Sequence, residues 1–200
     1  MNKLIEVVGA SGTGKTALVH ALAKTGRFVS AYEEHAERPF QALFKRDARY
    51  ALANQIDYLL LRAEQETQLR ASTSAQTGIM DGGLDLDFHG FTRLFHHRGL
   101  LTDSEFALCQ RFYTFLREGS PLPELIVRLY ADKDTVTNRL STRERVNIAS
   151  VEDTALFNSF LNEWLADVPT HHVLELDVSN EGLDYSESVQ AILDRIYARH

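Results

Sequence analysis

Short apolar runs alternate with longer stretches of helix-forming composition along the chain. The runs predict five strands, at residues 4–8, 27–32, 77–81, 125–130 and 173–176. The other stretches predict helices at 16–24, 39–70 with a break near Asp47, 88–97, 104–118, 133–140, 151–165 and 186–198. Because strands that alternate with helices build parallel sheets, the pattern predicts an α/β fold with a five-stranded parallel sheet sandwiched by helices.

Length and composition narrow the class of protein. The 200 residues fit one domain spanning 1–200, and a hydrophobic content of 44% is enough for one core. The net charge of −7 argues against a general nucleic-acid partner, which would need a basic surface. A single cysteine, Cys109, excludes an internal disulfide framework. No apolar run approaches the roughly 20 residues of a membrane span, so we expect a cytoplasmic protein without a membrane partner.

The segment between the first strand and the first helix matches the phosphate-binding pattern G-x-x-x-x-G-K-[ST] at every position. Its glycines let backbone N–H groups converge on phosphate oxygens, and the helix that follows points its N-terminus at the same anion. The lysine of such a loop reaches the β- and γ-phosphates, and the hydroxyl can ligate Mg²⁺. The sequence therefore predicts a nucleotide and Mg²⁺ site at Gly9, Ala10, Ser11, Gly12, Thr13, Gly14, Lys15 and Thr16.

The rest of the chain narrows the class of P-loop protein. It lacks the tetrapeptide N-K-x-D, which is typical of guanine-binding switch GTPases. Its third predicted strand ends in the single acid Asp81, where ATPases of the AAA type carry paired acids. A domain of this size with several arginines late in the chain suggests a kinase of a small molecule.

Four further motifs follow the phosphate loop in order. Glu33 stands six residues before Pro39-Phe40, Gln55 seven before Arg62, and Asp81 six before Asp87. Three arginines come next, at Arg139, Arg143 and Arg145. The whole series resembles the deoxynucleoside kinase family, from the loop to about Trp164. The resemblance implies a P-loop NTPase fold with a short arginine-rich lid at about 139–150, and ATP as the nucleotide.

The resemblance also assigns residues to the phosphoryl transfer. Glu33 matches the family's general base, and a carboxylate at the carboxyl end of a parallel strand faces the ligand crevice. Arg143 and Arg145 match lid arginines that close over the transferred phosphoryl group, and guanidinium groups suit bound phosphates. With Lys15, they are expected to stabilise the charge that develops during transfer.

Two more positions concern ATP and the metal. Arg139 is expected to contact ATP, and Asp81 matches the acid that assists the metal site beside Thr16. In the family this acid is followed by Arg and Ser, whereas this chain has Gly82 and Gly83. The missing Arg helps to hold the reacting groups, so its loss leaves open a relative that binds nucleotide without kinase activity.

The expected substrate site combines base-reading and sugar-facing positions. Gln55 and Arg62 lie two helical turns apart and share a face, and a glutamine amide suits the edge of a nucleobase. With Asp87, they match family positions that accompany purine or deoxycytidine preference over thymidine. Phe44 and Ile148 stand where the family commonly has Tyr and Glu to hold the sugar 3′-hydroxyl. This change leaves open a kinase of a different small substrate.

We therefore predict an enzyme that uses ATP and Mg²⁺ to phosphorylate the 5′-hydroxyl of a nucleoside or close analogue. The base would be a purine or cytosine. Family likeness also suggests a homodimer formed through the long helices. A screen of ATP consumption against nucleosides, nucleotides and small alcohols would separate this prediction from a silent nucleotide-binding relative and from a kinase of another substrate.

Overall fold

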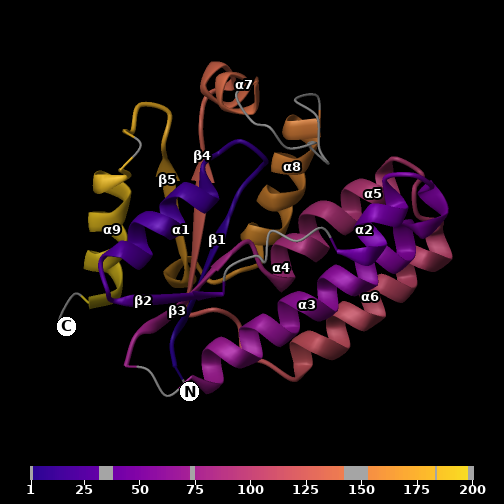
Figure 1. Ribbon diagram of the computed structural model, residues 1–200, viewed down its shortest axis with the longest axis horizontal. Helices are drawn as coiled ribbons and strands as arrows, with labels where there is room; N and C mark the ends of the chain where they lie inside the picture. The colour runs from indigo at the N-terminus through magenta and orange to yellow at the C-terminus, as the bar shows by residue number, and fades with distance from the viewer. Residues whose placement is uncertain (1, 32–37, 73–74, 142–152, 183, 198–200) are drawn as a thin grey trace.

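The computed structural model describes residues 2–31, 38–72, 75–141, 153–182 and 184–197. Five parallel strands form one sheet with the order β2-β3-β1-β4-β5 (Figure 1). Their bounds are β1 Leu4–Val8, β2 Phe28–Ala31, β3 Thr77–Asp81, β4 Leu125–Tyr130 and β5 Val173–Asp177. All five predicted strands are thus confirmed, within one or two residues at their ends.

Helices cover both faces of this sheet (Figure 1). They are α1 Lys15–Lys24, α2 Pro39–Phe44, α3 Ala51–Ala71, α4 Leu84–Leu86, α5 Arg93–His97, α6 Asp103–Glu118, α7 Lys133–Ser141, α8 Asp153–Ala166 and α9 Ser186–Tyr197. Shorter turns are the 3₁₀ helices η1 Ala48–Tyr50 and η3 Thr170–His172, and the π-helix η2 Asp87–Thr92. Among the described residues, no helix is both long and apolar enough to cross a bilayer.

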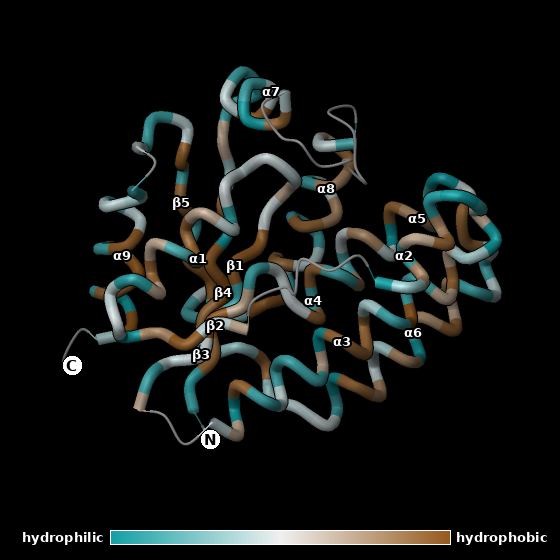
Figure 2. The backbone as a smooth tube through the Cα atoms, in the orientation of Figure 1, coloured by the Kyte–Doolittle hydropathy of each residue, from teal (hydrophilic) through white to brown (hydrophobic). Residues whose placement is uncertain are grey.

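Alternating side chains of β1 divide the core between the two faces. Ile5 and Val7 pack against α1 and α9, with Leu18 and Ile192 in the same cluster. Val8 packs on the opposite face, in a cluster built largely from α8. Figure 2 shows the strands as a hydrophobic centre between helices of mixed hydropathy. The predicted helix–sheet–helix sandwich is confirmed, because successive residues of a strand point to opposite faces.

Two helical regions differ in how well the sequence predicted them. The predicted break near Asp47 is confirmed, since the Asp47 carboxylate accepts a hydrogen bond from the Arg49 amide at 3.0 Å and separates α2 from α3. The helix predicted at 88–97 instead begins at Leu84 and passes through the π-helix η2. The Thr92 hydroxyl lies 2.9 Å from the Asp87 carbonyl oxygen across this wider turn.

The strand order places the expected ligand site at one edge of the sheet. From β1 the sheet extends in opposite directions, through β3 and β2 on one side and through β4 and β5 on the other. In open α/β sheets, ligands bind outside the carboxyl ends of the strands at such a reversal. The phosphate loop and Asp81 both lie at this edge, because they follow β1 and end β3.

Candidate active site

The phosphate loop contains two glycines in a backbone conformation that other residues adopt only with strain. Gly12 and Gly14 have φ of 86° and 98°, in the left-handed region. At Gly14 a Cβ atom would also overlap the hydroxyl of Tyr185, which lies just before α9. The loop therefore closes against a segment from the far end of the chain, and α1 begins directly after it at Lys15.

Lys15 and Thr16 lie at the start of α1, where the phosphates of a nucleotide would be bound. The Lys15 ammonium donates to the carbonyl oxygens of Gly9 and Ala10, at 2.9 and 3.0 Å. The Thr16 hydroxyl donates to the Asp81 carboxylate at 2.5 Å. The structure thus brings together the two expected metal ligands, one from α1 and one from the end of β3. Hydroxyl and carboxylate oxygens fit Mg²⁺, which takes oxygen ligands and completes its shell with water and phosphate.

Arg139 links the phosphate loop to Val178, the residue that follows β5. Its guanidinium donates to the carbonyl oxygens of Thr13 and Val178, at 3.0 and 3.1 Å. Beside it lies an open cavity of about 610 Å³, whose lining includes Gly14, Thr16, Arg139 and Tyr185. A cavity of this size is in the range of small-molecule and cofactor sites. Arg139 therefore borders this cavity, and its contact with ATP stays a prediction.

The expected base-reading residues lie together in the interior, on α3 and η2. Arg62 Nε donates to Asp87 Oδ2 at 2.8 Å, and their side chains are only 7% and 8% exposed. Arg62 also donates to Gln65 Oε1 at 3.1 Å. Gln55, also buried on α3, accepts a hydrogen bond at Oε1 from the Thr92 hydroxyl at 2.9 Å. The predicted shared face of Gln55 and Arg62 is confirmed, and Asp87 joins them.

Other expected site residues are placed elsewhere or lie outside the described residues. The ring of Phe44 packs against that of Phe95 at a tilt of 32°, with 5.0 Å between centroids, in the cluster between α3 and α6. Glu33, Arg143, Arg145 and Ile148 lie outside the described residues. The general base and the lid arginines therefore stay predictions.

Comparison with known proteins settles the family. A family model described as deoxynucleoside kinase matches residues 5–199. The chain belongs to the deoxynucleoside kinase family. This deoxynucleoside kinase is 25% identical over 206 aligned residues to the deoxyadenosine/deoxycytidine kinase of Bacillus subtilis (strain 168), covering 98% of this chain and 92% of that protein. It is 26% identical over 170 residues to the deoxyadenosine kinase of Dictyostelium discoideum, covering 82% and 67%.

The fold of this deoxynucleoside kinase also matches solved structures. The deoxyadenosine kinase from M. mycoides, with the products dCMP and a flexible dCDP bound, superposes with a TM-score of 0.78. The match has 18% sequence identity and covers 98% of this chain and all of that one. The predictions of a P-loop NTPase fold and of an ATP-dependent nucleoside kinase are thus confirmed.

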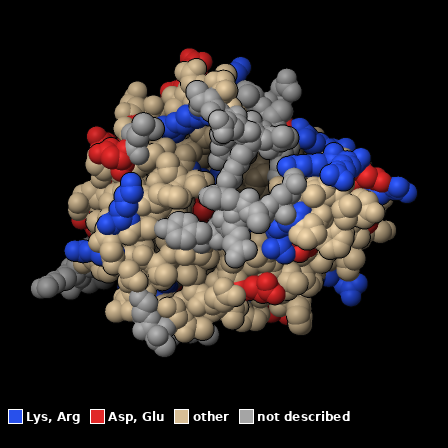
Figure 3. Space-filling view, viewed as in Figure 1, with Lys and Arg blue, Asp and Glu red and all other residues tan. Residues whose placement is uncertain are grey.

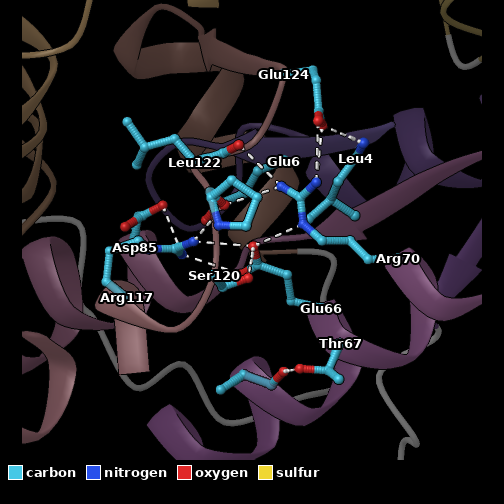
Figure 4. A network of polar contacts seen from close by, with 12 residues as sticks. Leu4, Glu6, Glu66, Thr67, Arg70, Asp85, Arg117, Ser120, Leu122 and Glu124 are labelled. Atoms are coloured by element: carbon cyan, nitrogen blue, oxygen red, sulfur yellow. Dashed lines mark hydrogen bonds and ion pairs between the residues drawn. The ribbon is translucent and has the colours of Figure 1, made fainter. Parts of the chain in front are cut away.

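A buried network of charged side chains next to the site was not predicted (Figure 4). Arg117 of α6 donates to Glu66 of α3 at 3.0 Å and to Asp85 at 3.1 Å. Glu6 of β1 accepts from the Leu86 amide at 3.3 Å, and burial raises its pKa well above the usual value, with the Asp85 charge adding to the effect. One signal could have found the network: Glu6 is the only charged residue of an otherwise apolar strand.

This network continues to the π-helix that carries Asp87. The Tyr113 hydroxyl donates to Asp85 Oδ1 at 2.6 Å and lies 3.1 Å from His89 Nε2. Burial, with the nearby Arg93 and Arg117 charges, lowers the pKa of His89 to about 4, so the ring is neutral at pH 7. Because Tyr113 gives its proton to Asp85, neutral His89 donates through Nε2 to the tyrosine oxygen.

The charge on the surface of the kinase is uneven although its net charge is −7. On the face shown in Figure 3, basic side chains gather over α2 and α5. Lys45, Arg46 and Arg49 are exposed at the end of α2 and in η1, and Arg49 is paired with Asp47 at 2.7 Å. An acidic protein can therefore still present a local basic surface.

Proposed function

We propose that this kinase transfers the γ-phosphoryl group of ATP to the 5′-hydroxyl of a nucleoside whose base is adenine, guanine or cytosine. The buried Arg62–Asp87 pair carries this proposal. An ionised carboxylate only accepts hydrogen bonds, so Asp87 favours a base with an amino group and repels the 4-oxygen of thymine. The names of the B. subtilis and D. discoideum relatives, which are deoxyadenosine or deoxycytidine kinases, support the same preference.

The roles of the site residues follow from their positions. The loop amides and Lys15 would bind the phosphates, and Thr16 with Asp81 would hold Mg²⁺, which supplies charge neutralisation when bound. Glu33 would accept the proton of the attacking 5′-hydroxyl. Arg143 and Arg145, in a lid at about 139–150 of a single domain 1–200, would stabilise the transferring charge. Because ATP is the phosphoryl donor, we also infer a cytoplasmic location.

The donor and the acceptor occupy different places in this proposal. The cavity beside Arg139 would hold the part of ATP that extends beyond the phosphate loop. Tyr185 packs against this loop at Gly14. Gln55, Arg62 and Asp87 would read the base of the acceptor, with Phe44 on the sugar side. ATP and the acceptor nucleoside would thus meet at the carboxyl ends of β1 and β3.

Calorimetric titration with deoxyadenosine and thymidine tests the acceptor preference. We expect deoxyadenosine to bind at least about tenfold more tightly, because a mismatched edge leaves buried polar groups unpaired. The double variant Arg62→Leu/Asp87→Leu should lose or invert this order. The matched control is Arg128→Leu/Glu175→Leu, which removes an ion pair of 2.8 Å between β4 and β5. Equal wild-type affinities would exclude base reading by these two residues.

Turnover separates an active kinase from a silent relative. Lys15→Ala should abolish ATP consumption in the presence of the preferred nucleoside and leave the far-ultraviolet circular dichroism unchanged. Wild-type protein that binds ATP but consumes none with nucleosides, nucleotides or small alcohols would identify the nucleotide-binding relative. Consumption with an acceptor other than a nucleoside would identify a kinase of another substrate.

A homodimer is the assembly that we infer for this enzyme. Phe115 of α6 is 71% exposed, and Leu108, two turns earlier, and Leu60 of α3 are also exposed. Leu60 and Phe115 line one open cavity of about 700 Å³ between the two helices. Phe115→Glu should convert the dimer to a monomer in sedimentation equilibrium, whereas Tyr130→Glu, at an aromatic position 40% exposed on β4, should not.

A further inference from the structure

Three buried carboxyl groups lie around two guanidinium groups in the network beside η2 (Figure 4). Glu6 of β1, Glu66 of α3 and Asp85 of α4 are each at most 2% exposed. Arg117 pairs with both Glu66 and Asp85, and Arg70 pairs with Glu66 from within α3. A buried carboxylate without a cation of its own is far more costly than a protonated carboxyl group. The cluster therefore favours one neutral carboxyl group among the three.

The hydrogen bonds of the cluster assign the proton to Glu6. Asp85 accepts from the Tyr113 hydroxyl at 2.6 Å and from Arg117 at 3.1 Å, and both bonds favour its charged form. The Glu6 carboxyl group is a further hydrogen-bond partner of Asp85, and two carboxyl groups in contact need a proton between them. Burial, helped by the Asp85 charge, also raises the pKa of Glu6 well above its usual value. Glu6 is therefore the donor in this pair.

The Glu6 carboxyl group also holds the backbone that leads into η2. Its Oε1 accepts from the Leu86 amide at 3.3 Å, and Leu86 directly precedes Asp87. A Cβ atom at Gly83 would overlap this carboxyl group, so Glu6 packs directly on the turn before α4. The Gly83 carbonyl oxygen in turn accepts from the Asp87 amide at 3.0 Å. The place of Asp87 thus depends on Glu6 through backbone contacts on both sides of α4.

We propose that Glu6 is a positioning residue, and that the proton it shares with Asp85 keeps η2 and Asp87 in place for the acceptor nucleoside. This inference rests on the proposed function and adds a control by pH to it. When Glu6 loses the proton, a second negative charge appears beside Asp85, and the two carboxylates repel one another. Residues 83–86 then shift, and acceptor binding weakens. The polar groups that face Glu6 belong to Glu66, Asp85, Leu86, Tyr113 and Arg117, and its neighbours in the sheet are Met80 and Ile126.

The KM for deoxyadenosine between pH 6 and pH 9 tests the inference, because the base does not titrate in this range. In the wild type we expect this KM to rise by about fivefold, the effect of one net hydrogen bond, while the KM for ATP stays constant. Glu6→Gln stays neutral and can still donate to Asp85 and accept from Leu86, so its KM should change by less than about twofold. The control is Glu175→Gln, which removes a half-exposed carboxylate of β5 and should follow the wild type.

Trp164 of α8 supplies a measurement that needs no ligand. It is the only tryptophan of the chain, and its ring lies 5.1 Å from the nearly parallel ring of His89 in η2. The pKa of His89 is about 4, so this ring does not titrate between pH 6 and pH 9. A change of Trp164 fluorescence in this range therefore reports a shift of η2. We expect such a change in the wild type and none in Glu6→Gln.

The outcomes separate this inference from the proposed function. If deoxyadenosine is phosphorylated and the KM profiles of wild type and Glu6→Gln are parallel, the inference fails alone. If deoxyadenosine neither binds nor reacts, the proposed function fails, and Trp164 fluorescence still decides whether Glu6 positions η2. Should Glu6→Gln not fold, Asp85→Asn serves instead, because it removes the repulsion that ionised Glu6 meets. It should flatten both pH profiles, and an unchanged rise in KM would overturn the inference.

Discussion

At the scale of single residues, a buried carboxyl group explains one departure from the family pattern. Gly83 stands where the family commonly has Ser, and a Cβ atom there would overlap the carboxyl group of Glu6. Glu6 itself is buried in the middle of β1 and cannot move toward solvent. The glycine is therefore needed by the buried charged network, whatever its effect on catalysis.

Gly83→Ala is expected to destabilise the fold by about 1–3 kcal/mol, as overpacking of a core typically does. Urea unfolding of Gly83→Ala measures this cost. Gly119→Ala is the control, since the atom nearest to its Cβ would lie at 3.5 Å. In a Glu6→Ala background the cost of Gly83→Ala should largely disappear. A cost that is the same in both backgrounds would show that Glu6 is not the cause.

At the scale of elements, a local capping motif in the sequence determines where α6 begins. The Thr102 hydroxyl accepts from the Glu105 amide at 3.3 Å, and the Glu105 carboxylate accepts from the Thr102 amide at 2.7 Å. This capping box fixes the start of the helix at Asp103, one residue before the predicted start. Its apolar side packs on α3, with Cys109 fully buried between the two helices.

Thr102→Ala is expected to cost about 1 kcal/mol, the usual effect of losing an N-cap side chain. For a domain of this size, the melting temperature should fall by about 2–4 °C in a calorimetric scan. Thr67→Ala serves as the control, because Thr67 donates to Ala63 within α3 and caps no helix end. Equal melting temperatures of Thr102→Ala and wild type would show that α6 does not need its cap.

The elements also show what the sequence could predict. Strands were located well because apolar runs such as 4–8 are bounded by turns and glycines. The start of the helix before η2 was missed because Asp85 and Asp87 indicate a solvated turn, whereas both are buried. Their partners Arg117 and Arg62 are distant in sequence, so no local pattern could reveal the compensation.

At the scale of the whole molecule, the buried charged network connects β1, α3 and α6. Its members are the ionisable side chains of Glu6, Glu66, Asp85 and Arg117. Burial raises the pKa of Glu6 and also that of Asp85, although Arg117 lies beside Asp85. A carboxyl group whose pKa is higher in the folded state binds a proton on folding. The stability gained from this proton is fully present when the pH is below the usual carboxyl pKa. It is lost as the pH rises through the raised pKa of the folded state.

Glu6→Gln should therefore make stability less sensitive to rising pH. Between pH 5 and pH 8 we expect the wild type to lose more unfolding free energy than Glu6→Gln, because glutamine stays neutral throughout. Glu105→Gln provides the control, since hydrogen bonds from Thr102 lower the pKa of Glu105 and its charge therefore does not change between pH 5 and pH 8. Its profile in this range should be parallel to that of the wild type. Urea titrations at several pH values measure both. Parallel pH profiles of Glu6→Gln and wild type would show that Glu6 does not titrate on folding.

The contact between Tyr185 and Gly14 has a consequence for the order of events during synthesis. The phosphate loop leaves the ribosome well before Tyr185 and the Val178 carbonyl that accepts a hydrogen bond from Arg139. The nascent chain thus carries an incomplete loop until β5 and α9 have emerged. A nucleotide in the cavity lined by Gly14 and Tyr185 would contact both segments, and would therefore stabilise their association only after both have been synthesised.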